Sequence, residues 1–316
     1  MMGAICCWAD GASTGARFMD FVIGDSLVLP VSSSHAALYA EKFMLLPASH
    51  LPTGHAELYP HLLRGSVSRP EAHDHPGECA QHGRARYGLP RHGVVLGFFG
   101  QHLKIDEQTF SRWLSMLTLL PGSVLWMLRW PSSTDKLVRQ AAAAGVRTSR
   151  LIFTDRLPQA EHLCAFQLAD LALDAPRYSS GATGIDVLWS GVPMLAMAGG
   201  MQPGGKPLQR ESGRANAAST NIFQRNAVSL VTAAAQPHLQ SHSSAGYVEL
   251  GLGLVRRNAT RAFAQKYARD VRHSAPLFDT RRWGVSLVAA ARAAWELRHA
   301  HGYAASMHII VAREVA

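Results

Sequence analysis

Five short apolar runs, separated by segments with helical spacing, lie between residues 93 and 199 and constrain the fold more than any other feature. Apart from Asp174 at the end of the fourth run, the residues are apolar without alternation, as in parallel strands that are covered on both faces. The runs are 94–99, 124–128, 151–153, 171–174 and 192–197. Because each return to a parallel strand needs a crossover helix, this order predicts an α/β fold with a doubly wound, Rossmann-like parallel sheet.

The size and composition of the chain place this sheet in a globular protein. The 316 residues, 47% of them hydrophobic, allow one large or two modest domains. Apolar runs fall short of the roughly 18 residues that a membrane-spanning helix needs, and the N-terminus lacks a secretory pattern. Four cysteines are too few for a disulfide-stapled scaffold, so we expect a soluble protein in a reducing compartment, with no membrane partner.

The formal charge of +9 raises the question of a nucleic-acid partner. The basic residues are scattered, and no zinc finger, aromatic RNA-binding motif or basic zipper accompanies them. Binding to RNA or DNA through charge is therefore the distant alternative. The charge better suits an anionic small ligand or an acidic partner.

The rest of the chain is less regular. A short buried strand is expected at 18–25, and helices are expected at 259–274 and 281–299. Two polar segments, 65–86 and 199–219, have the composition of a loop and a flexible insertion.

In an open parallel sheet, ligands bind beyond the carboxyl ends of the strands, where loops meet helix N-termini. This rule selects four loops: 100–106, 154–161, 174–186 and the loop that begins at 198. Lys104, in the first loop, supplies a point charge suited to a diphosphate. The alternative for this loop is a solvated turn with a helix N-cap at Asp106.

The loop 175–186 is rich in small residues and leads into a helix. Backbone amides at such a junction can approach phosphate oxygens, and the helix dipole favours negative charge there. Asp186 is expected in the first helical turn. There its carboxylate could accept hydrogen bonds from ribose hydroxyls, or it could pair with the dipole alone.

A candidate metal site has weaker support. His73, His75, Cys79 and His82 are potential zinc ligands, but their spacing matches no standard finger. The segment is better interpreted as part of a hydrophilic insertion, and we expect no metal.

Six segments together resemble one known family. They are 87–90 (YGLP), 104–106 (KID), 123–129 (SVLWMLR), 167–170 (QLAD), 183–194 (TGIDVLWSGVPM) and 274–279 (SAPLFD). In this order they resemble the C-terminal catalytic half of the protein O-GlcNAc transferases and SPINDLY-type enzymes, glycosyltransferase family 41. The resemblance runs from about residue 12 to residue 295, with gaps at the two polar segments.

The resemblance implies the GT-B fold, with two Rossmann-like lobes. It also implies transfer of N-acetylglucosamine from UDP-GlcNAc to Ser or Thr hydroxyls of proteins, without a metal or other cofactor. Nucleotide sugar and protein acceptors would be the partners, in the cytoplasm or nucleus. The alternatives are a SPINDLY-like protein O-fucosyltransferase that uses GDP-fucose, and a nucleotide-sugar-binding module without turnover.

The resemblance assigns four residues to the phosphate end of the donor site. Lys104 matches the family lysine that contacts the diphosphate and stabilises the leaving group, which makes it the expected catalytic residue. Gln101 matches its polar neighbour. Ala182 and Thr183 stand where the family has two threonines on the phosphates.

Three further residues are assigned to the nucleoside end. His162 matches a histidine that lies against the uracil, and backbone near Leu157 would contact the edge of the base. Asp186 matches an aspartate near the ribose. The residues expected to share one pocket at the strand ends are Gln101, Lys104, His162 and Thr183.

The resemblance also divides the chain into segments. The expected segments are a remnant of the N-terminal catalytic lobe (1–64), a flexible insertion (65–86), the nucleotide-sugar-binding lobe (87–280, with the insertion 199–219) and a C-terminal helix and tail (281–316).

Several positions differ from the family pattern. Gly181 and Ala182 replace a histidine and a threonine, Gln159 replaces a lysine and Ala165 replaces an arginine. The changes at Gly181, Ala182 and Ala165 each remove a polar contact, and the change at Gln159 replaces a charged side chain with a neutral one. We therefore expect a fragment or diverged member of the family that, as the 316-residue chain alone, binds UDP or a UDP-sugar weakly and transfers little or nothing.

Overall fold

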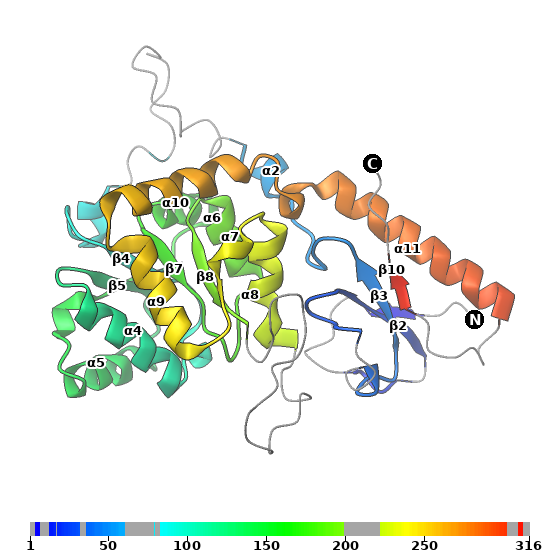
Figure 1. The fold of residues 1–316 in the computed structure, drawn as a ribbon, viewed down its shortest axis with the longest axis horizontal. Coiled ribbons are helices and arrows are strands. Elements are labelled where there is room, and N and C mark those ends of the chain that lie inside the picture. The colour runs from blue at the N-terminus through cyan, green and yellow to red at the C-terminus, as the bar shows by residue number, and fades with distance from the viewer. Residues whose placement is uncertain are drawn as a thin grey trace, which may run out of the picture.

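The computed structural model describes residues 4–6, 13–16, 18–31, 36–60, 79, 83–198, 222–301 and 309–311. These residues form two parallel sheets that lie side by side, each with helices against it (Figure 1). The predicted insertion 199–219 and most of 65–86 lie outside the described residues. No helix in the described part of the chain is long and apolar enough to cross a bilayer.

The larger sheet confirms the predicted doubly wound fold. Its strand order is β6-β5-β4-β7-β8-β9, and neighbouring strands are parallel. The strands are β4 (Val95–Phe98), β5 (Val124–Leu128), β6 (Leu151–Thr154), β7 (Leu171–Leu173), β8 (Met194–Met197) and β9 (Gln240–Ser241). The first five match the apolar runs; β9 has only two residues and was not predicted.

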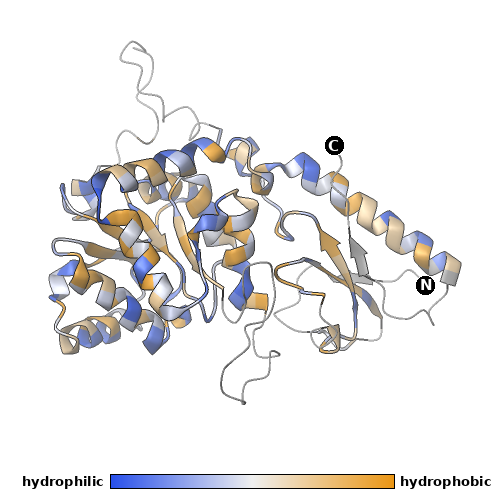
Figure 2. Cartoon of the chain, in the orientation of Figure 1, coloured by the Kyte–Doolittle hydropathy of each residue, from blue (hydrophilic) through white to orange (hydrophobic). Residues whose placement is uncertain are grey.

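Helices cover both faces of this sheet. One buried cluster contains α4 (Glu107–Leu119), α5 (Thr134–Ala143) and α9 (Ser244–Val255). The cluster on the other face contains α6 (Gln159–Phe166), α7 (Ala182–Trp189) and α8 (Ile222–Ala233). Figure 2 shows the strands as largely hydrophobic between helices with hydrophilic outer sides.

The strand order reverses between β4 and β7. From β4 the chain runs outward through β5 to β6, and then returns to the other side of β4 as β7. The loops that follow β4 and β7 consequently diverge and leave a crevice between them. Such a reversal is the point at which ligands bind in doubly wound sheets.

The smaller sheet draws strands from both ends of the chain. Its order is β1 (Ala4–Cys6), β2 (Met19–Asp25), β3 (Lys42–Leu46) and β10 (Ile309–Val311). The long helix α11 (Thr280–His301) lies along one face, where Ala290 and Ala294 share a buried cluster with Phe21 and Met44. The C-terminal helix therefore packs on the sheet formed by the N-terminal segment (Figure 1).

The remaining helices and turns complete the connections. They are α2 (His55–Leu58), α10 (Asn258–Val271), and the 3-10 turns Arg84–Tyr87, His102–Lys104, Thr148–Arg150, Pro237–Leu239 and Pro276–Phe278. The predicted cap of α4 is confirmed, because the Asp106 carboxylate accepts a hydrogen bond from Thr109 N at 2.8 Å.

A disulfide joins Cys79 to Cys164 on α6, which the cysteine count did not predict. Cys79 was considered as a zinc ligand, and in this structure its sulfur is bonded to the second cysteine. The three histidines of that candidate site lie outside the described residues. The disulfide anchors position 79 to the helix that follows β6.

Gly191→Ala is expected to lower the free energy of unfolding more than Gly145→Ala. Both glycines have positive φ, +74° and +76°, which costs an L-residue about 1–2 kcal/mol. A Cβ at Gly145 meets nothing within 4 Å, whereas at Gly191 it meets the Arg269 side chain and lies 3.3 Å from Arg269 Cα. Crowding of this kind adds about 1–3 kcal/mol. Urea unfolding of both variants is the measurement, and equal losses would contradict the expectation.

Candidate functional site

A cavity of about 540 Å³ lies at the crevice between the loops after β4 and β7. The smaller sheet closes its other side through Ile23, His50 and Leu51. Four of the seven predicted binding residues line it: Gln101, Lys104, Ala182 and Thr183. The loops that the carboxyl-end rule selected therefore bring these four residues to one cavity.

Lys104 lies in the cavity wall at the end of the 3-10 turn after β4. Its Nζ donates to Ser179 O at 3.3 Å and lies 4.3 Å from the centre of the Tyr178 ring. Burial lowers the pKa of Lys104, and the negative charge of nearby Asp174 opposes this shift. The ammonium is thus partly removed from water, and within the described part of the chain its one hydrogen bond is to a neutral carbonyl, so its charge is available to an anion in the cavity.

Asp174 lies behind this wall and is fully buried. Burial raises the pKa of its carboxyl, against the hydrogen bonds from Ser180 and the charge of Lys104. Ser180 N donates to Oδ1 at 2.8 Å, and Oδ2 has no hydrogen-bond partner among the described residues. This carboxyl holds the turn that carries Ser179 and leads into α7.

The first turn of α7 supplies backbone amides to the cavity. Gly181 is the N-cap residue and has no side chain to cap the helix. The amides that begin a helix have no partner within it, and the helix dipole adds partial positive charge there. Ala182 and Thr183 stand at this end and line the cavity, and Thr183 adds a hydroxyl.

The other three predicted residues do not line the cavity. His162 lies on α6 with its ring 4.4 Å from that of Phe166, and burial lowers its pKa despite the charge of Asp186. Leu157 is partly buried against the core. Of the four residues expected in one pocket, three share it and His162 lies outside its lining.

Asp186 differs from its prediction in position and in orientation. It is the fifth residue of α7, in the second turn, so the prediction of a first-turn residue is wrong. Its Oδ1 accepts from His55 Nε2 at 2.7 Å and from Gln159 Nε2 at 2.9 Å. These partners lie on α2 and α6, and their hydrogen bonds hold the carboxylate among protein groups.

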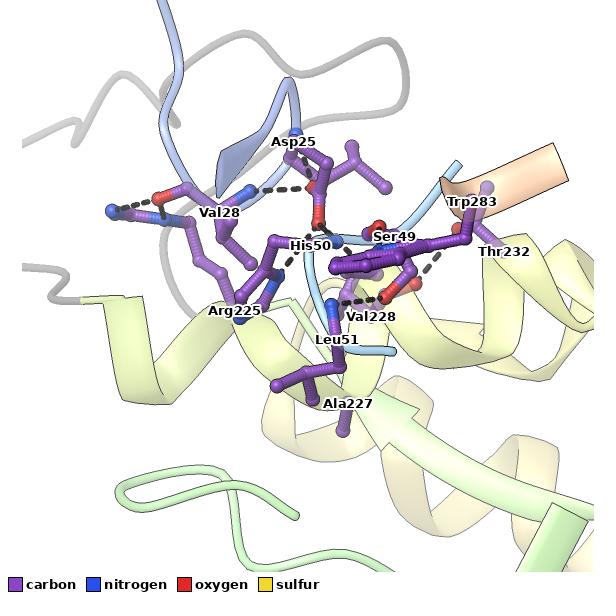
Figure 3. A network of polar contacts seen from close by, with 12 residues as sticks. Asp25, Val28, Ser49, His50, Leu51, Arg225, Ala227, Val228, Thr232 and Trp283 are labelled. Atoms are coloured by element: carbon purple, nitrogen blue, oxygen red, sulfur yellow. Dashed lines mark hydrogen bonds and ion pairs between the residues drawn. The ribbon is translucent and has the colours of Figure 1, made fainter. Parts of the chain in front are cut away.

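Sequence reasoning missed a second group of polar residues on the smaller sheet's side of the cavity. His50 lines the cavity, and its Nδ1 lies 2.9 Å from the buried carboxylate of Asp25 (Figure 3). Asp25 ends β2 and His50 follows β3. The carboxyl-end rule that selected Lys104 would have found Asp25 at the end of the expected strand 18–25, but not His50, because β3 was not predicted.

Comparison with solved structures identifies the fold class. An O-GlcNAc transferase mutant of Thermobaculum terrenum superimposes with a TM-score of 0.66 at 23% identity, over 90% of this chain and 46% of that one. The two sheets with a ligand crevice between them are thus the GT-B fold of glycosyltransferases, as predicted.

Comparison of sequences then shows which family the chain resembles. Residues 71–204 match the sequence model of Glycosyl transferase family 41. The probable UDP-N-acetylglucosamine–peptide N-acetylglucosaminyltransferase SEC of Arabidopsis thaliana is 30% identical over 287 residues, which are 90% of this chain and 26% of that protein. A UDP-N-acetylglucosamine–peptide N-acetylglucosaminyltransferase of Caenorhabditis elegans is 38% identical over 115 residues, 36% of this chain and 10% of that protein.

These matches confirm the predicted resemblance to the C-terminal catalytic region of glycosyltransferase family 41. The chain spans about a quarter of the length of the Arabidopsis relative and about a tenth of the length of the nematode relative.

Proposed function

We propose that the chain binds UDP-N-acetylglucosamine in the cavity at the β4–β7 crevice and takes part in transfer of N-acetylglucosamine to Ser or Thr hydroxyls of proteins. The observation that carries the proposal is the meeting of Lys104 with the uncapped start of α7 on one cavity wall. The names of the Arabidopsis and nematode relatives support this choice of donor and of acceptor.

The cavity suits a diphosphate that leaves from the anomeric carbon. As the bond from that carbon to the phosphate oxygen breaks, negative charge grows on the diphosphate. The Lys104 ammonium and the α7 amides are fixed before the reaction and would stabilise that charge. Gln101 and the Thr183 hydroxyl would add hydrogen bonds to the same oxygens.

The nucleoside would lie toward α6. Leu157, His162 and Asp186 form a second group there, beyond the cavity lining, and His162 and Asp186 interact electrostatically. We propose that His162 contacts the uracil and that Asp186 contacts the ribose once its bonds to His55 and Gln159 rearrange. This assignment rests on the family resemblance.

Two accompanying proposals concern metal ions and location. Lys104 and the helix amides supply the positive charge that a divalent cation supplies in metal-dependent transfer, so we propose that the reaction needs no metal. The cytoplasm or nucleus as the location stays a prediction.

Calorimetry with UDP is the direct test of donor binding. We expect weak binding, with Kd near the upper end of the roughly 1 μM–1 mM range typical of enzyme substrates. The reason is that Gly181 and Ala182 lack polar side chains, each of which is worth about 1 kcal/mol as a hydrogen bond. GDP is the control nucleotide, and we expect it to bind more weakly. Absence of UDP binding at millimolar concentration, or preference for GDP, would contradict the proposal.

A further inference from the structure

Asp25 stands at the centre of a buried polar network beside the cavity (Figure 3). Its Oδ1 accepts from the backbone amides of Leu27 and Val28, both at 3.0 Å. Its Oδ2 accepts from Ser229 Oγ on α8 at 2.8 Å and from the backbone amide of His50 at 3.2 Å. The carboxylate therefore joins β2, the segment after β3, and α8.

These donors keep the carboxyl ionised. Burial alone would raise the pKa of Asp25, but the hydrogen bond and charge of His50, with the bonds from Ser229 and Val28, outweigh it and lower the pKa. An ionised carboxylate only accepts hydrogen bonds, so the nitrogen that faces it must carry a proton.

The geometry fixes the tautomer of His50. Its Nδ1 lies 2.9 Å from Asp25 Oδ2 and must donate to it. In the neutral ring, Nε2 is then an acceptor with a free lone pair. No hydrogen bond to Nε2 occurs among the described residues, and His50 lines the cavity.

Few groups in the cavity wall could act as a base, and His50 Nε2 is one of them. Among the described residues that line the cavity, none is an aspartate or glutamate, and Lys104 and His50 carry the only side-chain nitrogen bases. Lys104 lies on the wall that suits the diphosphate. His50 comes from the smaller sheet, on the other side of the crevice.

A second histidine–carboxylate pair, His55 with Asp186, has a different arrangement. His55 donates to Asp186, but it does not line the cavity, and its Nδ1 is buried without a partner among aromatic rings. In His50, by contrast, Nδ1 faces the Asp25 carboxylate and the residue lines the cavity.

We propose that His50 Nε2 is the base that takes the proton of the acceptor hydroxyl, with Asp25 and Ser229 as positioning residues. This inference rests on the proposed function. The hydroxyl oxygen forms a bond to the anomeric carbon while the bond from that carbon to the phosphate oxygen breaks. UDP leaves with the electron pair, the hydroxyl proton moves to Nε2, and the imidazolium then releases it to water.

The other hydrogen bonds to the Asp25 carboxylate do not require the His50 imidazole. Asp25 would still hold the three elements through the amides of Leu27, Val28 and His50 and through Ser229, whatever the side chain at position 50. His50→Gln is therefore a suitable variant, because its amide can donate to Asp25 but cannot take up a proton.

The experiment combines two measurements on the whole chain. The first is a single-turnover assay with protein in excess over radiolabelled UDP-GlcNAc and an acceptor peptide, followed long enough to measure slow transfer. His50→Gln is expected to lower the rate about a hundredfold, as loss of a general base does, and to leave the Kd for UDP within about twofold. His238→Gln, at an exposed position outside the cavity, is the matched control and is expected to keep the rate.

The second measurement is the ¹⁵N spectrum of His50, which does not depend on turnover. The unmodified chain is expected to show protonated Nδ1 and unprotonated Nε2. Asp25→Asn, which can donate to the ring, is expected to raise the Nε2–H tautomer and to slow transfer by at least about tenfold. A merely structural Asp25 would not change the tautomer.

The outcomes separate this inference from the function on which it rests. Transfer by His50→Gln at an unchanged rate, or an Nε2–H tautomer in the unmodified chain, would contradict the role of His50 as the base. Neither result would affect the proposed donor site. If His50→Gln loses UDP affinity and transfer rate equally, His50 is a binding residue, and its role as the base is also contradicted. If the unmodified chain fails to bind UDP, the proposed function is contradicted. The role of His50 as the base, which rests on that function, is then contradicted as well.

Discussion

Lys104→Ala is expected to lower sugar transfer about a hundredfold. Loss of one preorganised group that stabilises transition-state charge typically costs roughly 3 kcal/mol, and each 1.4 kcal/mol or so is a factor of ten in rate. The effect should be large because the ammonium is half-buried and its single protein hydrogen bond is to Ser179 O. Its charge is therefore available to the diphosphate and is screened less than a surface charge would be.

The measurement is the single-turnover transfer assay, together with calorimetry on UDP. Affinity for UDP should also fall, though less than the rate, since part of the charge on the diphosphate appears only as the sugar leaves. Lys136→Ala is the matched control, because Lys136 is exposed on α5 and lies outside this cavity. A Lys104→Ala rate within about threefold of the unmodified chain would exclude the catalytic role.

The larger sheet was predictable because its strands are fully buried. A strand covered on both faces must be apolar at every position, and such runs are visible in a single sequence. The sequence did not predict β9 or β10, because β9 has no apolar run and the apolar run of β10 is too short to interpret. β9 has two residues, and β10 pairs with β3 across more than 260 positions, a partner that only the folded chain reveals.

The same contrast applies to the site. Gln101, Lys104, Ala182 and Thr183 follow strands of the larger sheet at the point where its order reverses, so topology alone brings them together. The direction of Asp186 depends instead on His55, a residue 131 positions away.

The Asp25–His50 pair was missed for a related reason. Its members lie on different segments of the smaller sheet, and its third member, Ser229, comes from α8 of the larger lobe. Local patterns do not encode a carboxylate that joins three such elements.

Asp25→Ala is expected to lower the free energy of unfolding by at least about 3 kcal/mol at neutral pH, because several buried donors lose a charged acceptor and each such hydrogen bond is worth about 1.5–3 kcal/mol. The substitution leaves the amides of Leu27 and Val28, the Ser229 hydroxyl and His50 Nδ1 without their acceptor. Asp155→Ala is the control, because the Asp155 side chain is 82% exposed and its pair with Arg129 is worth at most about 1 kcal/mol.

The pH dependence gives a second test of this network. The pKa of Asp25 is lowered in the folded protein, so its stabilisation is complete above the unfolded value of about 3.9 and is lost as pH falls through the folded value. The difference in unfolding free energy between the unmodified chain and Asp25→Ala should therefore be constant near neutral pH and shrink below about pH 4. Urea titrations at a series of pH values measure it. A difference that grows on acidification would mean that Asp25 is protonated in the native state, and His50 would then lose the charged acceptor that orients it.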